Sequence, residues 1–219
     1  MARKNSLFSV TSLGSLLACA AAVGCVEQQD DKPTVEDMAF VKQHLLTEEP
    51  KPQLQVNADL DGKVVYLGLD ADPPQVEPGK DVKITHYWKV ITPPGDGWRT
   101  FTHTSGPNNQ GFLNWDHHPI RGKYPVSQWK AGDIIRDEHM IRMAPTWPHK
   151  TVEVYTGLWK GSGRLTVKTG PQDGQNRVRA ATLEVKGQKP LPELRYVARK
   201  VKKAPPKAGT GTSRQSNGR

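Results

Sequence analysis

The sequence predicts an all-β protein: an immunoglobulin-like antiparallel β-sandwich of about seven strands, with one short N-terminal helix and a disordered C-terminal tail. Apolar and polar residues alternate through residues 63–186, which is the period of a β-strand. Clusters of Gly and Pro separate the alternating runs, and no amphipathic helix lies between them. The chain of 219 residues has only two Cys, so burial and not a disulfide must hold the sheets together. A β-barrel is the alternative architecture.

The first 25 residues predict a lipoprotein signal peptide. A basic start at Arg3 and Lys4 precedes an uncharged apolar run that is short for a transmembrane helix. Cys19 and Cys25 each follow small or apolar residues, as in the bacterial lipobox, in which the Cys thiol is acylated. Cys25 is the favoured lipid attachment site because the apolar run ends there, and Cys19 is the alternative. An ordinary secretory signal with incidental Cys is the other interpretation.

The next segment, residues 26–62, is expected to form a tether and a short helix. Thr34 and Asp37 predict a capping box at the start of a helix over residues 34–47. Four apolar residues share one face of that helix at helical spacing, namely Val35, Met38, Val41 and Leu45. Two prolines end the helix, and residues 53–62 are expected to be a connection.

The β-sandwich is predicted over residues 63–190. The expected strands are residues 63–69, 81–91, 98–105, 134–143, 151–160, 164–168 and 177–186. The second strand shows the alternation most clearly, with one face made of Val82, Ile84, His86, Trp88 and Val90. Residues 106–132 contain Gly, Pro and Asn throughout and are expected to be a long loop.

The tail, residues 191–219, is predicted to be disordered and basic. Residues 195–219 hold eight Lys or Arg and no Asp or Glu, in a chain of net charge +9. For an exported protein, anionic lipid or acidic polysaccharide is a better partner than nucleic acid, which is not expected. A solvated tail without a partner is the other interpretation.

A group of His and Asp residues is the richest candidate chemistry. Zinc or copper would suit His103, Asp116, His117 and His139, which would then serve a metal-dependent enzyme. No H-x-H or H-E-x-x-H spacing is present, however. We therefore expect no cofactor, and a buried hydrogen-bond network in which His103, Asp116 and His117 hold the loop on the sheet. His86 is expected to be a core histidine.

Asp137 and His139 fall on one face of their strand, and we expect them to form a structural polar pair, with an acid–base pair as the alternative. The chain also has six Trp residues, three of them in loop-rich sequence. Exposed Trp rings stack on sugars, so a carbohydrate-binding module is an alternative that would use Trp115, Trp129 and Trp147. Otherwise these rings belong to the packing of the core.

A family pattern is also present. Its motifs are Phe101-Thr102-His103, Asp116-His117-His118-Pro119, Gly122-Lys123-Tyr124-Pro125, Trp129, Gly132-Asp133, Asp137, Tyr155-Thr156-Gly157-Leu158-Trp159 and Arg164-Leu165. Together they resemble the extracytoplasmic β-sandwich domain found C-terminal to bacterial membrane glycosyltransferases, and also as free-standing exported proteins. The pattern departs at Asp133, where Glu is usual, and at Trp159, where Tyr is usual. The resemblance implies the fold and the compartment but no catalytic residue.

These expectations combine into one functional prediction. The protein is expected to be a bacterial cell-envelope lipoprotein, held to a membrane by its N-terminal lipid and facing the periplasm or the surface. It is expected to act as a non-catalytic binding or interaction module. Carbohydrate binding and metal-dependent catalysis stay open as alternatives.

Overall fold

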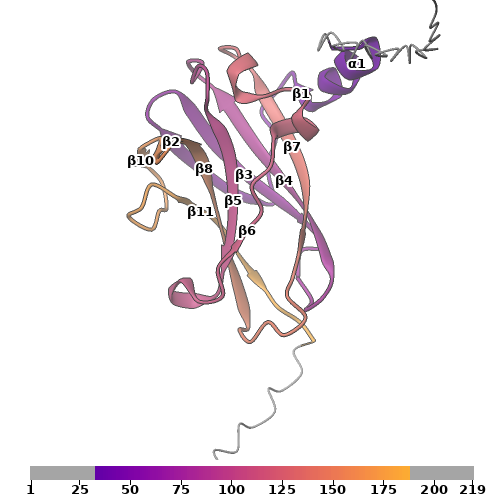
Figure 1. Ribbon diagram of the computed structural model, residues 1–219, viewed down its shortest axis with the longest axis vertical. Helices are drawn as coiled ribbons and strands as arrows, with labels where there is room; N and C mark the ends of the chain where they lie inside the picture. Colours follow the sequence, from indigo (N-terminus) through magenta and orange to yellow (C-terminus); the bar gives the residue numbers. More distant parts are fainter. Residues whose placement is uncertain (1–32, 188–219) are drawn as a thin grey trace, which may run out of the picture.

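The computed structural model describes residues 33–187, which form two antiparallel β-sheets packed face to face (Figure 1). The predicted all-β sandwich is therefore confirmed. The six-stranded sheet contains, in spatial order, β1 (Leu45–Leu46), β7 (Ile134–Arg142), β4 (Asp81–Val90), β3 (Val64–Asp72), β2 (Leu54–Leu60) and β10 (Val167–Thr169). The second sheet contains β11 (Val178–Glu184), β8 (Thr151–Lys160), β5 (Arg99–Ser105) and β6 (Leu113–Asn114), and β9 (Gly163–Arg164) pairs with β8.

The core lies between the sheets and is built from inward-facing alternate residues. The predicted inward face of β4 is fully buried, and its Trp88 ring packs against Tyr66 and Trp129, with centroids 4.6 and 6.2 Å away. Burying one large apolar side chain stabilises the fold by about 1.5–3 kcal/mol. The opposite sheet adds Val152, Val154, Leu158, Val178 and Leu183. Burial thus holds the two layers together across the whole interface.

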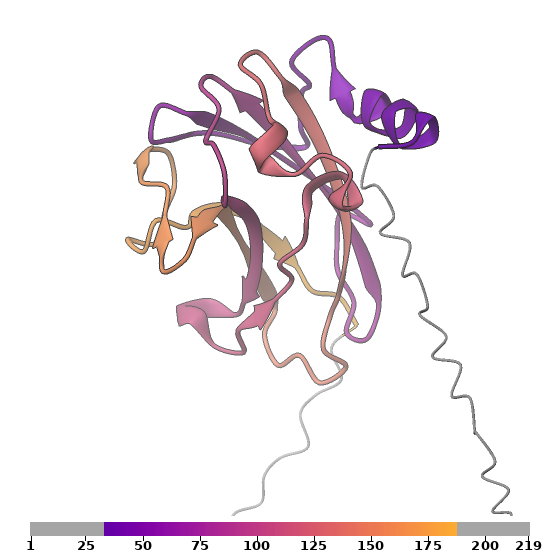
Figure 2. The same ribbon diagram turned by 45° about the horizontal axis from the view of Figure 1, so that its top comes forward.

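Helix α1 (Val35–His44) lies beside the edge of the six-stranded sheet (Figure 2). Its predicted capping box is present, because Thr34 Oγ1 accepts from the Asp37 N–H and the Asp37 carboxylate accepts from the Thr34 N–H. The helix ends at residue 44 instead of 47, since the next two residues pair with β7 as β1. Of the predicted apolar face, Val41 and Leu45 pack against the core, whereas Val35 and Met38 are exposed.

Two predictions about the strands are wrong. Residues 53–62 are not a connection, because they include β2, which pairs with β3. Asn57 has a φ of 55° at an irregularity in this pairing, and the extra residue hides the alternation of the strand. The predicted strand 164–168 is divided, since β9 pairs with β8 and β10 pairs with β2 of the other sheet. The other six predicted strands are present.

The long loop, residues 106–132, folds over the edge of the sandwich. It contains β6 and the 3₁₀ turns η1 (Pro107–Asn109), η2 (Pro119–Gly122) and η3 (Val126–Gln128). Ile120, Val126 and Trp129 from this loop are buried in the core, which fixes the loop to both sheets.

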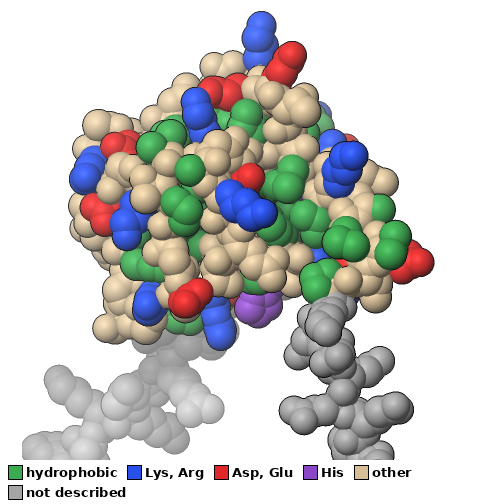
Figure 3. All heavy atoms as spheres, turned by 90° about the horizontal axis from the view of Figure 1, so that it is seen from above, with side chains coloured by type: hydrophobic (Ala, Val, Ile, Leu, Met, Phe, Trp, Pro, Cys, Tyr) green, Lys and Arg blue, Asp and Glu red, His purple; other side chains and the backbone are tan. Residues whose placement is uncertain are grey.

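The surface at the end near α1 carries hydrophobic, basic and acidic side chains interspersed (Figure 3). Residues 33–187 contain no helix with the length and hydrophobicity needed to cross a membrane. The predicted signal peptide, with Cys19 and Cys25, and the predicted basic tail lie outside the described residues.

Candidate functional site

Two adjacent loop residues, Asp116 and His117, turn to opposite faces of β5. Asp116 Oδ1 lies 3.3 Å from His103 Nε2, whereas His117 Nε2 lies 2.8 Å from Asp137 Oδ2. Because successive side chains alternate along a strand, His103 faces outward, while Thr102 faces the interior. The predicted network of His103, Asp116 and His117 is therefore wrong, since it is two separate pairs.

The predicted metal ligands are divided in the same way. His103 and Asp116 lie on the outer face, while His117 and His139 lie inside with Asp137 and His86. Within residues 33–187, no group of three or more His, Cys, Asp or Glu side chains is arranged to hold a metal ion. The structural polar pair predicted for Asp137 and His139 is also corrected, since the hydrogen-bond partners of Asp137 are His117 and the Ile120 N–H.

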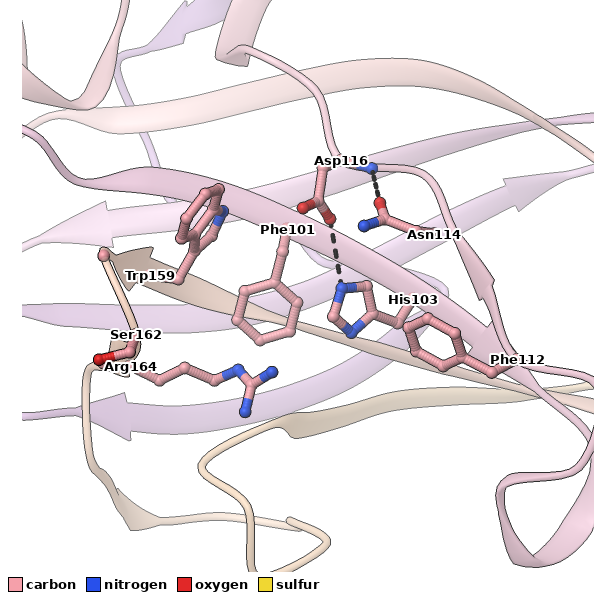
Figure 4. Close-up of a pocket in the computed structure, with 10 residues that line it drawn as sticks. Phe101, His103, Phe112, Asn114, Asp116, Trp159, Ser162 and Arg164 are labelled. Carbon is pink, nitrogen blue, oxygen red and sulfur yellow. Dashed lines mark hydrogen bonds and ion pairs between the residues drawn. The ribbon is translucent and has the colours of Figure 1, made fainter.

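The outer face of β5 and β8 carries a pocket of about 240 Å³, here called the outer pocket (Figure 4). It is lined by a row of rings from Trp159, Phe101, His103 and Phe112. The His103 ring centroid is 4.7 Å from that of Phe101 and 4.8 Å from that of Phe112. Phe112 is 48% exposed, so this ring offers an accessible apolar surface at one end of the row.

Gly157 makes room for this row. It lies opposite Phe101 in the pairing of β5 with β8, and a Cβ atom at this position would stand 2.8 Å from the Phe101 ring. The tight turn between β8 and β9 then brings Arg164 over the same ring, with its guanidinium carbon 5.3 Å from the centroid. Phe101 is thus the floor of the pocket, with Arg164 as one wall.

Polar groups surround the rings of the outer pocket. Asp116 and Asn114 stand on the side opposite Arg164 (Figure 4), and the Asp116 N–H donates to Asn114 Oδ1 at 2.7 Å. Two ring nitrogens of the row, His103 Nδ1 and Trp159 Nε1, are buried without a hydrogen-bond partner among residues 33–187. Buried polar atoms are normally paired, so these two nitrogens need a partner, as do Trp88 Nε1, Ser105 Oγ and Arg136 Nε outside the pocket. The pocket therefore combines apolar rings with an acid, an amide and a guanidinium.

The inner group of histidines, here called the histidine stack, comprises His86, His139 and His117. The His139 ring lies 3.8 Å from the His117 ring and 5.3 Å from the His86 ring, with all three nearly parallel. His86 Nδ1 bonds to the Tyr66 hydroxyl at 2.8 Å, and its Nε2 lies 3.0 Å from Thr102 Oγ1. His86 is therefore the core histidine that the sequence predicts.

The His117 and Asp137 side chains form the charged part of the stack. His117 Nδ1 faces the Trp115 carbonyl oxygen at 3.3 Å and Nε2 faces the Asp137 carboxylate, so both nitrogens donate. Burial opposes the charge on His117, but the Asp137 hydrogen bond and charge raise its pKa above the usual value. Burial also opposes ionisation of Asp137, yet His117 and the Ile120 N–H lower its pKa. The pair is thus a buried ion pair.

His139 and His86 are held neutral. Burial, with the nearby charge of His117, lowers the pKa of His139 to about 2 and that of His86 well below its usual value. Their Nε2 atoms are 3.3 Å apart, so one of them carries the shared proton. The stack thus holds one charged imidazole and two neutral ones.

The predicted stacking residues are mostly inside the protein. Trp129 and Trp147 are buried, and their indole N–H groups donate to the backbone carbonyls of Tyr124 and Thr151. Trp115 is half-buried and donates to Thr104 Oγ1 at 2.9 Å. The prediction of stacking platforms is therefore wrong for the two buried rings, which are part of the core.

Sequence reasoning gave no site role to five residues of the outer pocket, namely Phe101, Phe112, Asn114, Trp159 and Arg164, although the motifs of the family resemblance include the first and the last two. One signal was present: Gly157 interrupts a strand of large side chains and indicates close approach by a neighbouring group.

No known family model matches the chain, and no curated protein shows significant sequence similarity to it. The geometry of the outer pocket and of the histidine stack is therefore the basis for inferring a function.

Proposed function

We propose that the protein is an exported cell-envelope lipoprotein that acts as a non-catalytic binding module, and that its outer pocket binds a neutral carbohydrate. One observation carries the proposal: a row of aromatic rings on the outer face of the sheet is flanked by hydrogen-bonding side chains. The predicted alternative of sugar stacking is thus reassigned from the loop Trp residues to Phe101 and Trp159 of the sheet and Phe112 of the adjoining loop.

The chemistry of the pocket suits a sugar ring. A pyranose presents an apolar C–H face, which packs on an aromatic ring, and a rim of hydroxyls, which need donors and acceptors. Phe112 and Trp159 offer the ring surface, Asp116 accepts hydrogen bonds, and Arg164 donates them. Because Asp116 and Arg164 carry opposite charges, we expect the pocket to prefer a neutral sugar over a strongly charged one.

Binding without catalysis fits the placement of the reactive groups. For covalent catalysis, the pair of His103 with Asp116 would need a nucleophilic side chain within hydrogen-bond reach of the imidazole. Ser162, the hydroxyl side chain of the pocket lining, lies at the opposite end of the row, beyond Phe101 and Trp159 (Figure 4). This arrangement supports ligand capture more than acyl or glycosyl transfer.

The test is a titration of the purified full chain with neutral hexose and N-acetylhexosamine disaccharides, followed by calorimetry and saturation-transfer NMR. We expect Phe112→Ala to weaken the binding about two- to tenfold, the value of one aromatic contact. Ile91→Ala is the matched control, since Ile91 is 47% exposed and lies outside the pocket. Failure of every disaccharide to bind, or equal losses in both variants, would contradict the proposal.

Membrane attachment through Cys25 is the second part of the proposal, supported by the lipobox-like sequence. The intact mass of the membrane-extracted chain should begin at Cys25 and include acyl chains. Cys25→Ser should move the protein to the soluble fraction, whereas Cys19→Ser should leave it on the membrane. A lipid-free mass would overturn this part.

The basic tail, residues 191–219, is proposed to add contacts with anionic lipid or polysaccharide.

A further inference from the structure

A second pocket, of about 410 Å³, opens beside the histidine stack and is here called the cationic pocket. Most of its lining side chains are hydrogen-bond donors or imidazoles, namely Lys83, Arg121, His117, His118 and His139. Met140, which is 56% exposed, supplies an apolar wall. Most of the exposed surface inside the pocket is apolar, so the pocket offers an apolar wall together with several donor side chains to whatever enters it.

Acidic groups compensate only part of this charge. Glu138 is the single carboxylate of the lining, and its Oε1 lies 3.3 Å from Arg136 Nε. Lys83 Nζ is 3.9 Å from the exposed carboxylate of Asp72, a separation at which an ion pair in water contributes little. His117 is balanced by Asp137. The guanidinium of Arg121 and the ammonium of Lys83 thus remain available to an anion.

The neutral His139 adds hydrogen bonding without charge. Among residues 33–187, the hydrogen bonds of His139 use only Nε2, which faces His86. No hydrogen bond within residues 33–187 uses its Nδ1, and the residue lines the pocket. The contact with His86 holds the imidazole in place and so fixes the direction of Nδ1.

The turn that carries Arg121 is held in an unfavourable backbone conformation. Ile120 and Arg121 have φ values of 51° and 54°, in the left-handed region that β-branched residues rarely adopt. The Ile120 N–H donates to buried Asp137 Oδ1 at 2.9 Å, and Arg121 packs over Phe40, 5.3 Å from the ring centroid. Strain of this kind persists only where surrounding contacts enforce it, and it is concentrated at ligand sites. Here it fixes Arg121 at the rim of the cationic pocket.

We propose that the cationic pocket is a second binding site, which takes the phosphate group of a small ligand against Lys83, Arg121 and His118. A phosphate oxyanion accepts hydrogen bonds from several donors at once, and the side chains of this lining can supply them. A sugar hydroxyl would use fewer of these donors. Met140 then contacts the apolar part of a phosphate ester. The site is independent of the outer pocket, so either proposal can fail while the other holds.

The experiment is a calorimetric titration of the purified full chain in about 0.15 M NaCl, at which long-range attraction between exposed charges is screened. Inorganic phosphate and dihexanoylphosphatidylglycerol, the latter below its micelle concentration, are the two phosphate probes. Dihexanoylphosphatidylcholine, whose headgroup has no net charge, is the comparison. We expect one saturable site for at least one of the two anionic probes and much weaker binding of the phosphatidylcholine.

Variants locate the site. Arg121→Asn and Lys83→Gln should each weaken the binding tenfold or more, because each removes a charge-assisted hydrogen bond that contributes about 1.5–3 kcal/mol. Asn tolerates the left-handed backbone at residue 121, so that variant should keep its fold. Lys186→Gln, an exposed lysine outside the pocket, should bind as the parent chain does. Phe112→Ala, which weakens the proposed sugar site, should also leave phosphate binding unchanged, since Phe112 lies outside the cationic pocket.

The outcomes separate the sources of the phosphate group. Binding of inorganic phosphate as tightly as the lipid indicates a free phosphate or a simple ester. Binding of phosphatidylglycerol alone indicates a lipid headgroup, with Met140 in contact with its apolar part. The proposal is overturned if neither anionic probe saturates a site, if phosphatidylcholine binds equally well, or if Lys186→Gln loses as much affinity as Arg121→Asn.

Discussion

Within residues 33–187, two histidine–carboxylate pairs consist of the same chemical groups, but their carboxylates lie in opposite surroundings. The pair of His103 with Asp116 is on the outer face of β5, where the Asp116 side chain is 30% exposed. The pair of His117 with Asp137 is on the inner side, where the Asp137 side chain is 0% exposed. Asp116 and His117 are neighbours in the loop that follows β6, so the two environments are separated by a single step along the chain.

Burial decides what each pair can do. Water reaches the Asp116 carboxylate and can be displaced there by a ligand, although the His103 side chain is only 8% exposed, so the outer pair suits recognition more than stability. The Asp137 carboxylate of the inner pair is fully buried, and the cost of removing the two charges from water is offset by their mutual contact, by the Ile120 N–H and by the Trp115 carbonyl oxygen that faces His117. We infer that the inner pair fastens the long loop to β7, while the outer pair is available for binding. The variants below test this difference.

The largest effect is expected from Asp137→Ala. This change leaves the His117 imidazole and the Ile120 N–H buried without their partner, and loss of one member of a buried ion pair costs about 3–5 kcal/mol. Urea unfolding should show a free energy of unfolding lower by that amount, and with it a lower midpoint. Asp137→Asn keeps an acceptor for Ile120 and should recover part of the loss. Equal stability of the parent and Asp137→Ala would mean that the inner pair does not fasten the loop.

A smaller loss is expected from Gly157→Ala, which tests the floor of the outer pocket. The new Cβ would stand 2.8 Å from Phe101, so the ring must move, and overpacking of this kind costs about 1–3 kcal/mol. Gly163→Ala is the matched control in the same pocket, since its nearest neighbour is 3.7 Å away. Disaccharide binding should fall in the first variant only. Unchanged binding in Gly157→Ala would show that the ring row does not form the site.

The dependence of stability on pH should reflect the protonation of the histidine stack. The pKa values of His86 and His139 are lower in the folded protein than in the unfolded chain, so their contribution is complete above pH 6.5 and declines as the pH falls below it. The pKa of His117 is raised, so its contribution is present below pH 6.5 and is lost at higher pH. Stability should therefore be greatest near pH 6.5.

On the acid side, each of the two neutral histidines should reduce stability by about 1.4 kcal/mol per pH unit. Thermal unfolding between pH 4 and pH 8 measures this slope. In a His139→Gln variant the acid-side slope should be roughly halved, because one of the two protonating groups of the unfolded chain is removed. An Ile91→Ala variant, which changes an exposed side chain and no titratable group, should keep the parent slope. A parent slope no steeper than that of His139→Gln would contradict the assignment.

The fold was more predictable than the site, for a physical reason. The alternation of Val82, Ile84 and Trp88 is a local property of one strand, and it was sufficient to place β4 and the core. Strand β2 was missed because a single residue, Asn57, shifts the alternation to the other face. The outer pocket was missed because Gly157 and Arg164 contact Phe101 from neighbouring strands. The local sequence pattern of one strand does not indicate which strands pair with it.

The smallest effect on stability is expected from Asp116→Ala, the outer counterpart of the first variant. Removing an exposed partner of His103 should change the free energy of unfolding by no more than about 1 kcal/mol, measured by urea unfolding at pH 6.5. Disaccharide binding should nevertheless fall, because the pocket loses its carboxylate acceptor. A stability loss as large as that of Asp137→Ala would mean that both pairs are structural. A small loss of stability with a clear loss of binding would assign recognition to the outer pair and fastening to the inner one.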